Sequence, residues 1–280
     1  METKIIVDST FDMTEETKSR LTIIPLTVTF GDTEYIDGVT ITREEFYEKL
    51  IEGDTLPTTS QAPPFAFSEE IEEIVKNGDS AVIITIASTL SGTYQSACTA
   101  AADYSDRIFV VDSETTAIGG GILAERALQL IDEGRSAKEI ADILNSEKKK
   151  ICIIALLDTL EYLKRGGRIS KTAALAGDIF SIKPVISLKD GEIKVLGKAR
   201  GSKRGNNLLN EEISSCGGVD FSKPVLLGYT GLSDKMLNKY IADSEAVWKG
   251  KIEELHSTLL GSVIGTHVGP GAIAAAFFEN

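Results

Sequence analysis

The segment GTHVGPGA, at residues 265–272, surrounds His267, one of only two histidines among 280 residues. Three glycines and a proline around one imidazole let the backbone come close to a ligand, and we expect an irregular loop that leads into a strand. The imidazole could act as a general base, a metal ligand, part of a phosphate-binding loop or a hydrogen-bond donor to a buried acid. Residue spacing alone leaves a purely structural role equally open.

Two other polar segments could face this histidine. The segment STLSGTY, at residues 88–94, follows an apolar run, so Ser91 would be the N-cap of a helix at the carboxyl end of a parallel strand. Open α/β sheets bind ligands at this edge, and the free N–H groups of a helix N-terminus favour an anion. The segment TTSQ, at residues 58–61, adds hydroxyl groups in a loop held between Pro57 and Pro63. A simple helix cap and an ordinary turn are the alternatives.

A basic run interrupts a chain that is otherwise acidic. Residues 198–204 (KARGSKR) include Arg200 and Arg204, whereas the whole chain carries a formal net charge of −13. This run is either a solvated hairpin end or a patch that docks a partner or binds an anion. The overall acidity argues against nucleic acid as a partner, because neutralising phosphates requires a surplus of lysine and arginine.

Motifs for nucleotides, metals and membranes are missing from the sequence. It contains neither a P-loop pattern nor a G-x-G-x-x-G turn between a strand and a helix, so we expect no nucleotide cofactor. Two histidines without carboxylates at ligand spacing predict no metal site. Cys98, Cys152 and Cys216 are far apart and form no CxxC pattern, and Cys98 and Cys152, inside apolar runs, are expected to be buried as small apolar residues. No apolar run reaches the ~20 residues of a transmembrane helix and no signal segment is recognisable, so we expect a cytoplasmic protein.

The elements that must position these side chains alternate between strands and helices in the first half of the chain. Continuous apolar runs predict buried strands, and periodic patterns with caps such as Thr42 and Glu45 predict helices. The expected strands lie at 4–10, 81–87, 107–113 and 150–157, and the expected helices at 41–53, 65–78, 91–104, 118–132 and 137–147. Residues 22–38 indicate a small β excursion. This rhythm predicts a doubly wound parallel-sheet domain over residues 1–157.

The second half mixes antiparallel pairs with helices. A polar, helix-like segment is expected at 157–170, followed by a hairpin at 184–205 around the Asp190-Gly191 turn. The remaining expected elements are helices at 206–216 and 233–246 and strands at 224–229 and 272–278. We therefore predict an α/β fold whose second domain is α+β and covers residues 158–280.

Five motifs in register resemble the DegV family over essentially the whole chain. They are VDST at 7–10, TTSQ at 58–61, SGTYQSA at 91–97, LKRGGRIS at 163–170 and GTHVGPGA at 265–272. One departure is that Ala62-Pro63 follows TTSQ, where the family usually has Pro-Ser. The resemblance implies two domains with a fatty-acid tunnel between them.

The resemblance also implies a carrier and not an enzyme, without metal or cofactor. Several DegV-like proteins are the fatty-acid-binding subunit of a bacterial fatty acid kinase system, the FakB role. They bind a long-chain fatty acid and present it to a separate dihydroxyacetone-kinase-like subunit, which makes the acyl phosphate. The residues implied for this chain are Thr59, Ser91 and His267 on the carboxylate, Ser60 and Thr93 beside them, Arg168 in support, and Arg200 and Arg204 for kinase docking and the phosphate.

Two other functions stay open. A serine hydrolase of acyl esters would use Ser91 as nucleophile and His267 as base, with Asp8 or Asp112 orienting the imidazole, although the pattern G-x-S-x-G is absent. A kinase with its own nucleotide site would need a phosphate loop that the sequence lacks. A carrier needs neither a nucleophile nor a phosphate loop, because it does not run the chemistry itself. Its affinity can come from the acyl chain, each buried methylene of which contributes about 0.8 kcal/mol to binding.

Overall fold

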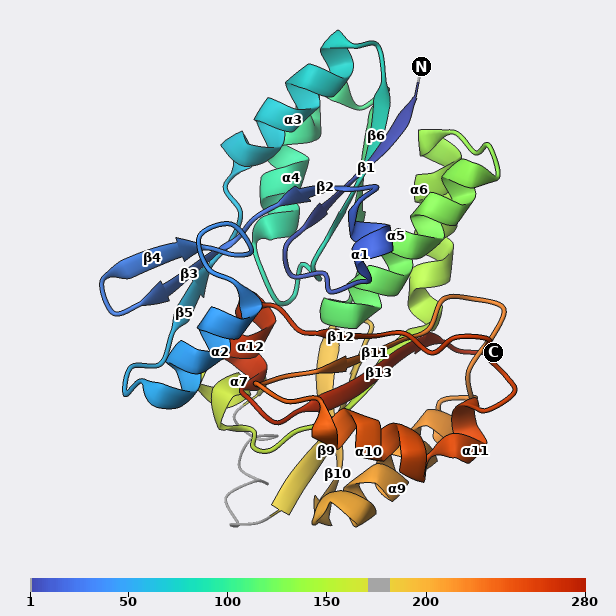
Figure 1. Cartoon of the computed structure of the whole chain (residues 1–280). Helices are drawn as coiled ribbons and strands as arrows, with labels where there is room; N and C mark the ends of the chain where they lie inside the picture. The colour runs from blue at the N-terminus through green and yellow to red at the C-terminus, as the bar shows by residue number, and fades with distance from the viewer. Residues whose placement is uncertain (1, 171–181) are drawn as a thin grey trace.

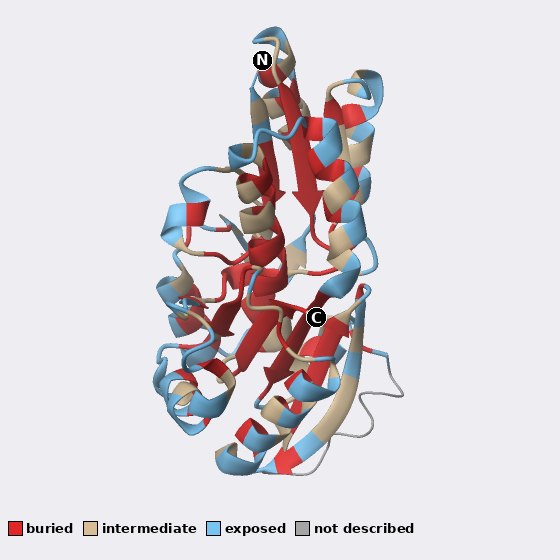
Figure 2. Ribbon diagram, turned by 90° about the vertical axis from the view of Figure 1, so that its right-hand side faces the viewer, coloured by how far each residue is buried: buried red, intermediate tan, exposed pale blue. Residues whose placement is uncertain are grey.

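The computed structural model of the chain describes residues 2–170 and 182–280, whose strands form three sheets. Helix α5 (Ala117–Asp132) lies between the two large sheets, and the small sheet projects at one side (Figure 1). Buried residues run through both large sheets and the helix between them (Figure 2), because side chains from all three pack into one hydrophobic core. None of the described helices is long and apolar enough to cross a membrane.

The first sheet is parallel and has helices on both faces. Its order is β2-β1-β6-β7, formed by β1 (Thr3–Asp8), β2 (Thr22–Ile24), β6 (Ser80–Thr85) and β7 (Ile108–Asp112). The covering helices are α3 (Pro64–Lys76), α4 (Thr93–Ala101), α5 and α6 (Ala137–Glu147). Because side chains alternate along a strand, Ile5 and Val7 of β1 pack toward α5 and α6, whereas Ile6 packs toward α3 and α4. The predicted doubly wound parallel sheet is therefore confirmed.

The second sheet is mixed and has six strands in the order β10-β9-β8-β13-β11-β12. The strands are β8 (Ile151–Leu156), β9 (Ile182–Lys189), β10 (Glu192–Arg200), β11 (Leu226–Tyr229), β12 (Ser257–Leu259) and β13 (Ile273–Phe278). Helices α9 (Ser202–Ser215), α10 (Lys235–Asp243) and α11 (Glu245–Trp248) cover the face away from α5. The predicted hairpin is present as β9 and β10, and its turn residues Asp190 and Gly191 have φ of +52° and +72°.

Strand β8 corrects one expectation. The sequence assigned residues 150–157 to the parallel sheet, but β8 pairs antiparallel with β13 and β9 in the six-stranded sheet. A strand buried on both faces needs a continuous apolar run in either sheet, so its composition carries no information about its neighbours. The domain division at residue 157 stays a prediction.

The predicted β excursion is a small antiparallel sheet with the order β4-β3-β5, formed by β3 (Thr27–Phe30), β4 (Thr33–Ile36) and β5 (Thr58–Ser60). The expectation of a loop at residues 58–61 is wrong for Thr58–Ser60, because this segment pairs with β3. Helix α2 (Arg43–Glu52) begins with the predicted capping box of Thr42 and Glu45. The remaining elements are α1 (Glu15–Lys18), α7 (Glu161–Arg165) and the 3₁₀ turns Ala102–Tyr104 and Lys148–Lys150.

The glycine-rich segment gives the third correction. Helix α12 (Ser262–Val268) contains the first half of GTHVGPGA, so His267 lies in the last turn of a helix and not in a loop. The chain leaves this helix at Gly269, whose φ of +75° suits glycine. Helix α12 packs against α2 and α7, and β13 then follows as predicted.

Candidate functional site

A cavity of about 390 Å³ lies where the parallel sheet, the six-stranded sheet and α12 meet. Its polar wall is formed by Thr59, Ser60, Gln61, Ser91, Gly92, Arg168 and His267. Its apolar wall is formed by Leu26, Ile86, Leu90, Leu163, Ile193, Val263, Ile264 and Val268. The cavity thus brings together five of the residues that the sequence singled out, from four separate segments of the chain.

Two further cavities adjoin this one. A cavity of about 310 Å³ shares Thr59, Arg168 and His267 with it and is lined on its outer side by the exposed residues Thr58 and Arg165. We call it the mouth. A narrower cavity of about 70 Å³ shares five lining residues with the central one on its other side, and its lining is almost entirely apolar. We call it the inner end, so the three cavities run from a polar, basic surface to an apolar interior.

His267 forms the junction between the mouth and the central cavity. Its Nε2 atom is 2.9 Å from the hydroxyl oxygen of Thr59, and its Nδ1 atom has no hydrogen-bond partner within residues 2–170 and 182–280. Gly166 packs directly against the ring, where any Cβ atom would overlap Nδ1. Burial, and to a smaller extent the nearby Arg168 guanidinium, lowers the pKa of His267 to about 4. The ring is therefore neutral at neutral pH, with Nε2 toward Thr59 and Nδ1 buried against Gly166.

Carboxylates from the first half of the chain hold the helix that carries His267. The backbone N–H groups of Gly261 and Ser262, at the start of α12, donate to Asp12 at 2.8 Å and to Asp37 at 3.3 Å. Gly265 faces Phe46 of α2, where a Cβ atom would come within 2.5 Å of the Phe46 ring. Gly265 thus serves helix packing, because it lets α12 lie directly on α2.

Ser91 and Thr93 stand at the start of α4. Their hydroxyl oxygens are 2.9 Å apart, and Ser91 also accepts from the Thr93 backbone N–H at 3.3 Å. The predicted N-cap at Ser91 is wrong by one residue, because Gly92 occupies the N-cap position of α4. Thr93 is fully buried behind Ser91 and does not line any of the three cavities, so only Ser91 faces the central cavity.

Ser60 and Arg168 complete the predicted wall. Ser60 is exposed at the end of β5 and lines the cavity with its neighbour Thr59. The Arg168 guanidinium donates to the carbonyls of Leu90, at 3.2 Å, and Gly166, and so ties the segment after α7 to the segment before α4. Arg168 therefore both lines the site and connects two of its walls.

Sequence reasoning missed two polar residues of the site. Gln61 lines the central cavity, and its side chain packs against Gly92 while its amide donates to Ser96 at 3.0 Å. Thr116 lines the central cavity and the inner end, and its buried hydroxyl has no partner among the described residues. Gln61 ends the TTSQ segment, and that motif was the signal available for it, whereas no local signal marks Thr116.

The basic run does not reach the cavities. Arg200, at the end of β10, and Arg204, in the first turn of α9, are exposed and do not line any of the three cavities. Arg200 is seven residues beyond Ile193, the cavity residue of the same strand, which corresponds to roughly 20 Å along β10. These arginines therefore form a separate surface.

A hydrolytic arrangement is not assembled around Ser91. In the part of the chain that the structure describes, no hydrogen bond joins Ser91 to His267, whose Nε2 is engaged by Thr59. Asp8 accepts from Thr10 and Ile86, and Asp112 accepts from Ser88 and Glu114, so neither carboxylate orients the imidazole. Nucleophile, base and orienting acid must form one hydrogen-bonded chain for this chemistry.

Fold and site together define an α/β protein with two large sheets and one small sheet, and with a largely apolar cavity that has a polar, basic mouth. The sequence model of the DegV family matches residues 2–280, and the chain belongs to this family. It is 36% identical over 282 residues to a DegV domain-containing protein of Caldanaerobacter subterraneus, covering 99% of this chain and 98% of that relative.

Solved structures agree with this assignment. A DegV family protein from Thermus thermophilus, described as fatty-acid binding, has a TM-score of 0.87 at 29% identity, with 99% of this chain matching 100% of that protein. A stearic acid-binding protein from Eubacterium ventriosum has a TM-score of 0.86 at 29% identity, with 100% of this chain matching 99% of that protein.

Proposed function

We propose that this protein binds a long-chain fatty acid, with its carboxylate at the polar wall and its acyl chain in the central cavity and the inner end. The observation that carries the proposal is the pair of His267 and Thr59, placed where the mouth meets the apolar interior. Ser91 and Ser60 line the same wall, and Thr93 orients the Ser91 hydroxyl from behind. The fatty acids bound by structurally similar proteins of the same family support this ligand class.

The two ends of the cavity contribute differently to the free energy of binding. A carboxylate that leaves water needs hydrogen-bond donors. The Ser91 hydroxyl supplies one, and the pair of Thr59 and His267 supplies another: when Nε2–H of the neutral imidazole donates to Thr59, the Thr59 hydroxyl donates to the carboxylate. The acyl chain contributes on the order of 10 kcal/mol for some 12 to 16 buried methylenes, before ordering costs are subtracted. Most of the affinity therefore comes from the apolar interior, and the polar wall sets the orientation.

The orientation suits a carrier that hands the acid to another protein. In this role the chain presents the carboxylate, in the cytoplasm, to a dihydroxyacetone-kinase-like subunit that phosphorylates it to the acyl phosphate. The mouth supports this role, because the exposed side chain of Arg168 lines it in a chain with a net charge of −13, next to Arg165, which pairs with Glu161 at 2.7 Å. Such a local cationic rim favours phosphate groups and an acidic partner surface. Arg200 and Arg204, on their separate surface, would be docking contacts for the kinase.

The experiment that tests the binding proposal compares an acid with its ester. Delipidated protein is titrated calorimetrically with palmitate and with methyl palmitate, which has the same chain but no charge. We expect one palmitate per chain and at least tenfold weaker binding of the ester, because charge-assisted hydrogen bonds stabilise only the carboxylate. Equal affinities would remove the carboxylate from the polar wall, and no binding of either compound would refute the function.

A further inference from the structure

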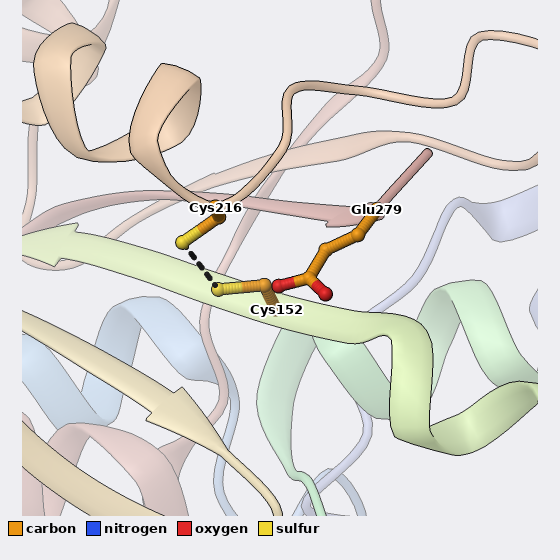
Figure 3. Close-up of side chains that lie close together, drawn as sticks. All are labelled: Cys152, Cys216 and Glu279. Atoms are coloured by element: carbon orange, nitrogen blue, oxygen red, sulfur yellow. Dashed lines mark hydrogen bonds between the residues drawn. The ribbon is translucent and has the colours of Figure 1, made fainter.

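Two cysteines and a glutamate lie close together beside β8 (Figure 3). This face of the six-stranded sheet packs against α9, whereas the opposite face lines the inner end. Cys152 lies on β8, Cys216 follows α9, and Glu279 follows β13. Successive side chains of a strand point to opposite faces of the sheet. Cys152 therefore packs with α9, whereas its neighbour Ile153 lines the inner end. The cluster is therefore structurally separate from the proposed fatty-acid site.

The distances in this cluster are those of a ligand set. The two sulfur atoms are 3.5 Å apart, and the ligand atoms of all three residues lie within 4.8 Å of one another. We propose that Cys152, Cys216 and Glu279 form a site for a thiophilic divalent cation of the Zn²⁺ type, with water as the fourth ligand. Zn²⁺ binds thiolates at about 2.3 Å, so two thiolates of a tetrahedral site lie about 3.8 Å apart. A small side-chain rotation covers the difference.

The charges of the neighbourhood balance such an ion. Both carboxylate oxygens of Glu279 are 2.7 Å from the ammonium group of Lys189. Two thiolates, one carboxylate, one ammonium group and one divalent cation sum to zero, which removes the main cost of burying an ion. Lys189 keeps one carboxylate oxygen when the other turns to the metal, and so orients the ligand from behind.

Access and protonation also fit metal binding. Cys152 is completely buried, whereas Cys216 and Glu279 are half-buried, so an ion enters from the side of Cys216. Zn²⁺ binds thiolates and not thiols, so both protons of the thiol pair leave to solvent as the site fills.

The test is a titration of reduced, metal-free full-length protein with Co²⁺ and Zn²⁺. Bound Co²⁺ gives thiolate charge-transfer absorption, which reports the sulfur ligands directly. We expect one ion per chain, at least 100-fold weaker binding in Cys216→Ser and about tenfold weaker binding in Glu279→Gln. Cys98→Ser, which changes the third cysteine outside the cluster, is the matched control and should bind like the wild type.

Three outcomes would overturn the proposal. One is the absence of charge-transfer absorption at saturating Co²⁺, and another is equal binding in wild type and Cys216→Ser. The third is a reduced protein that binds no metal but forms a disulfide between Cys152 and Cys216 on mild oxidation, seen as a loss of two mass units. The two cysteines would then be a disulfide-forming pair. Circular dichroism of Cys216→Ser checks its fold, and Glu279→Gln leaves both thiols in place should that variant unfold. Palmitate binding should be unchanged in all variants.

Discussion

The imidazole Nε2 of His267 lies 2.9 Å from the hydroxyl oxygen of Thr59, although the two residues are 208 positions apart in the chain. Thr59 is on the edge of the small sheet, and His267 is in the last turn of α12. The proposed carboxylate site therefore forms only when the last helix packs on the first half of the chain. Substitutions on either partner test this assembly separately from the apolar cavity.

Thr59→Val removes the hydroxyl at nearly constant volume. We expect about tenfold weaker palmitate binding, equivalent to about 1.4 kcal/mol, because one donor to the carboxylate and the partner of His267 are lost together. Thr33→Val, an exposed threonine on β4 of the same small sheet, is the control and should bind normally. Calorimetric titration measures both. Unchanged affinity of Thr59→Val would exclude Thr59 from the carboxylate site.

The low pKa of His267, about 4, makes stability depend on pH in a defined direction. In the unfolded chain the imidazole has its ordinary pKa of 6.5, so it binds a proton that the native state cannot accept. The contribution of His267 to the free energy of unfolding is fully present above pH 6.5. It is lost as the pH falls from 6.5 to 4, by roughly 3 kcal/mol. Urea unfolding at pH 7 and pH 4.5 should show a smaller decrease in the free energy of unfolding for His267→Gln than for the wild type.

The same pKa can be read directly from the ring. In the His256→Gln variant the only remaining imidazole signal belongs to His267, and its ¹H–¹³C resonance should not shift between pH 8 and pH 5.5. A midpoint near 6.5 would contradict the buried, neutral ring.

Gly166 and Gly167 should separate binding from stability. Gly166 has no room for a Cβ atom beside His267, so Gly166→Ala should displace the imidazole and weaken palmitate binding about tenfold or more. Gly167 has φ of +70° and open space around it, so Gly167→Ala should instead lower the free energy of unfolding by about 1 kcal/mol with normal binding. Calorimetry and urea unfolding of both variants check the contrast. The reverse pattern would place the carboxylate elsewhere.

The inner end should set the longest chain that fits. Ala274 of β13 and Ala155 of β8 are neighbours across the sheet, and both line this cavity. Ala274→Leu should fill the space of about three methylenes and weaken stearate binding roughly 50-fold, or about 2.4 kcal/mol. Laurate, which ends before this point, is the internal control. Equal losses for both acids would show that the acyl chain takes another path.

Arg200 and Arg204 should matter for transfer and not for binding. Because both lie away from the cavities, Arg200→Glu with Arg204→Glu should leave palmitate affinity unchanged. Acyl-phosphate formation with the proposed kinase partner should fall at least tenfold, since the proposed docking surface changes its charge. Lys194→Glu, an exposed lysine of the same strand, is the matched control. If the double variant loses binding as well, the two arginines are structural.

The sequence predicted what local chemistry determines. Apolar runs gave β1 and β6, and capping residues gave the start of α2, because these signals act within a few residues. Strand pairing between distant segments could not be predicted from local patterns. Thr58–Ser60 pairs with β3, and β8 pairs with β13 and β9. Likewise α12 is helical in spite of its glycines, because Asp12, Asp37 and the surface of α2 hold it.

The candidate site shows the same division. Thr59, Ser91 and His267 were found through motifs, whereas Thr116 faces the cavity without any local signal. The thiol cluster was invisible for a related reason, because 64 positions separate its two cysteines and the pairing of β13 with β8 brings Glu279 to them. Contacts of this kind follow from the fold and not from spacing.

Native mass spectrometry of the protein as purified from a bacterial host, followed by solvent extraction of the same sample, tests fatty-acid binding directly. We expect a species heavier than the chain by the mass of one long-chain fatty acid, and recovery of that acid in the extract. Delipidated protein should gain the mass of one palmitate on incubation with that acid. A protein of bare chain mass that takes up no added fatty acid would refute fatty-acid binding.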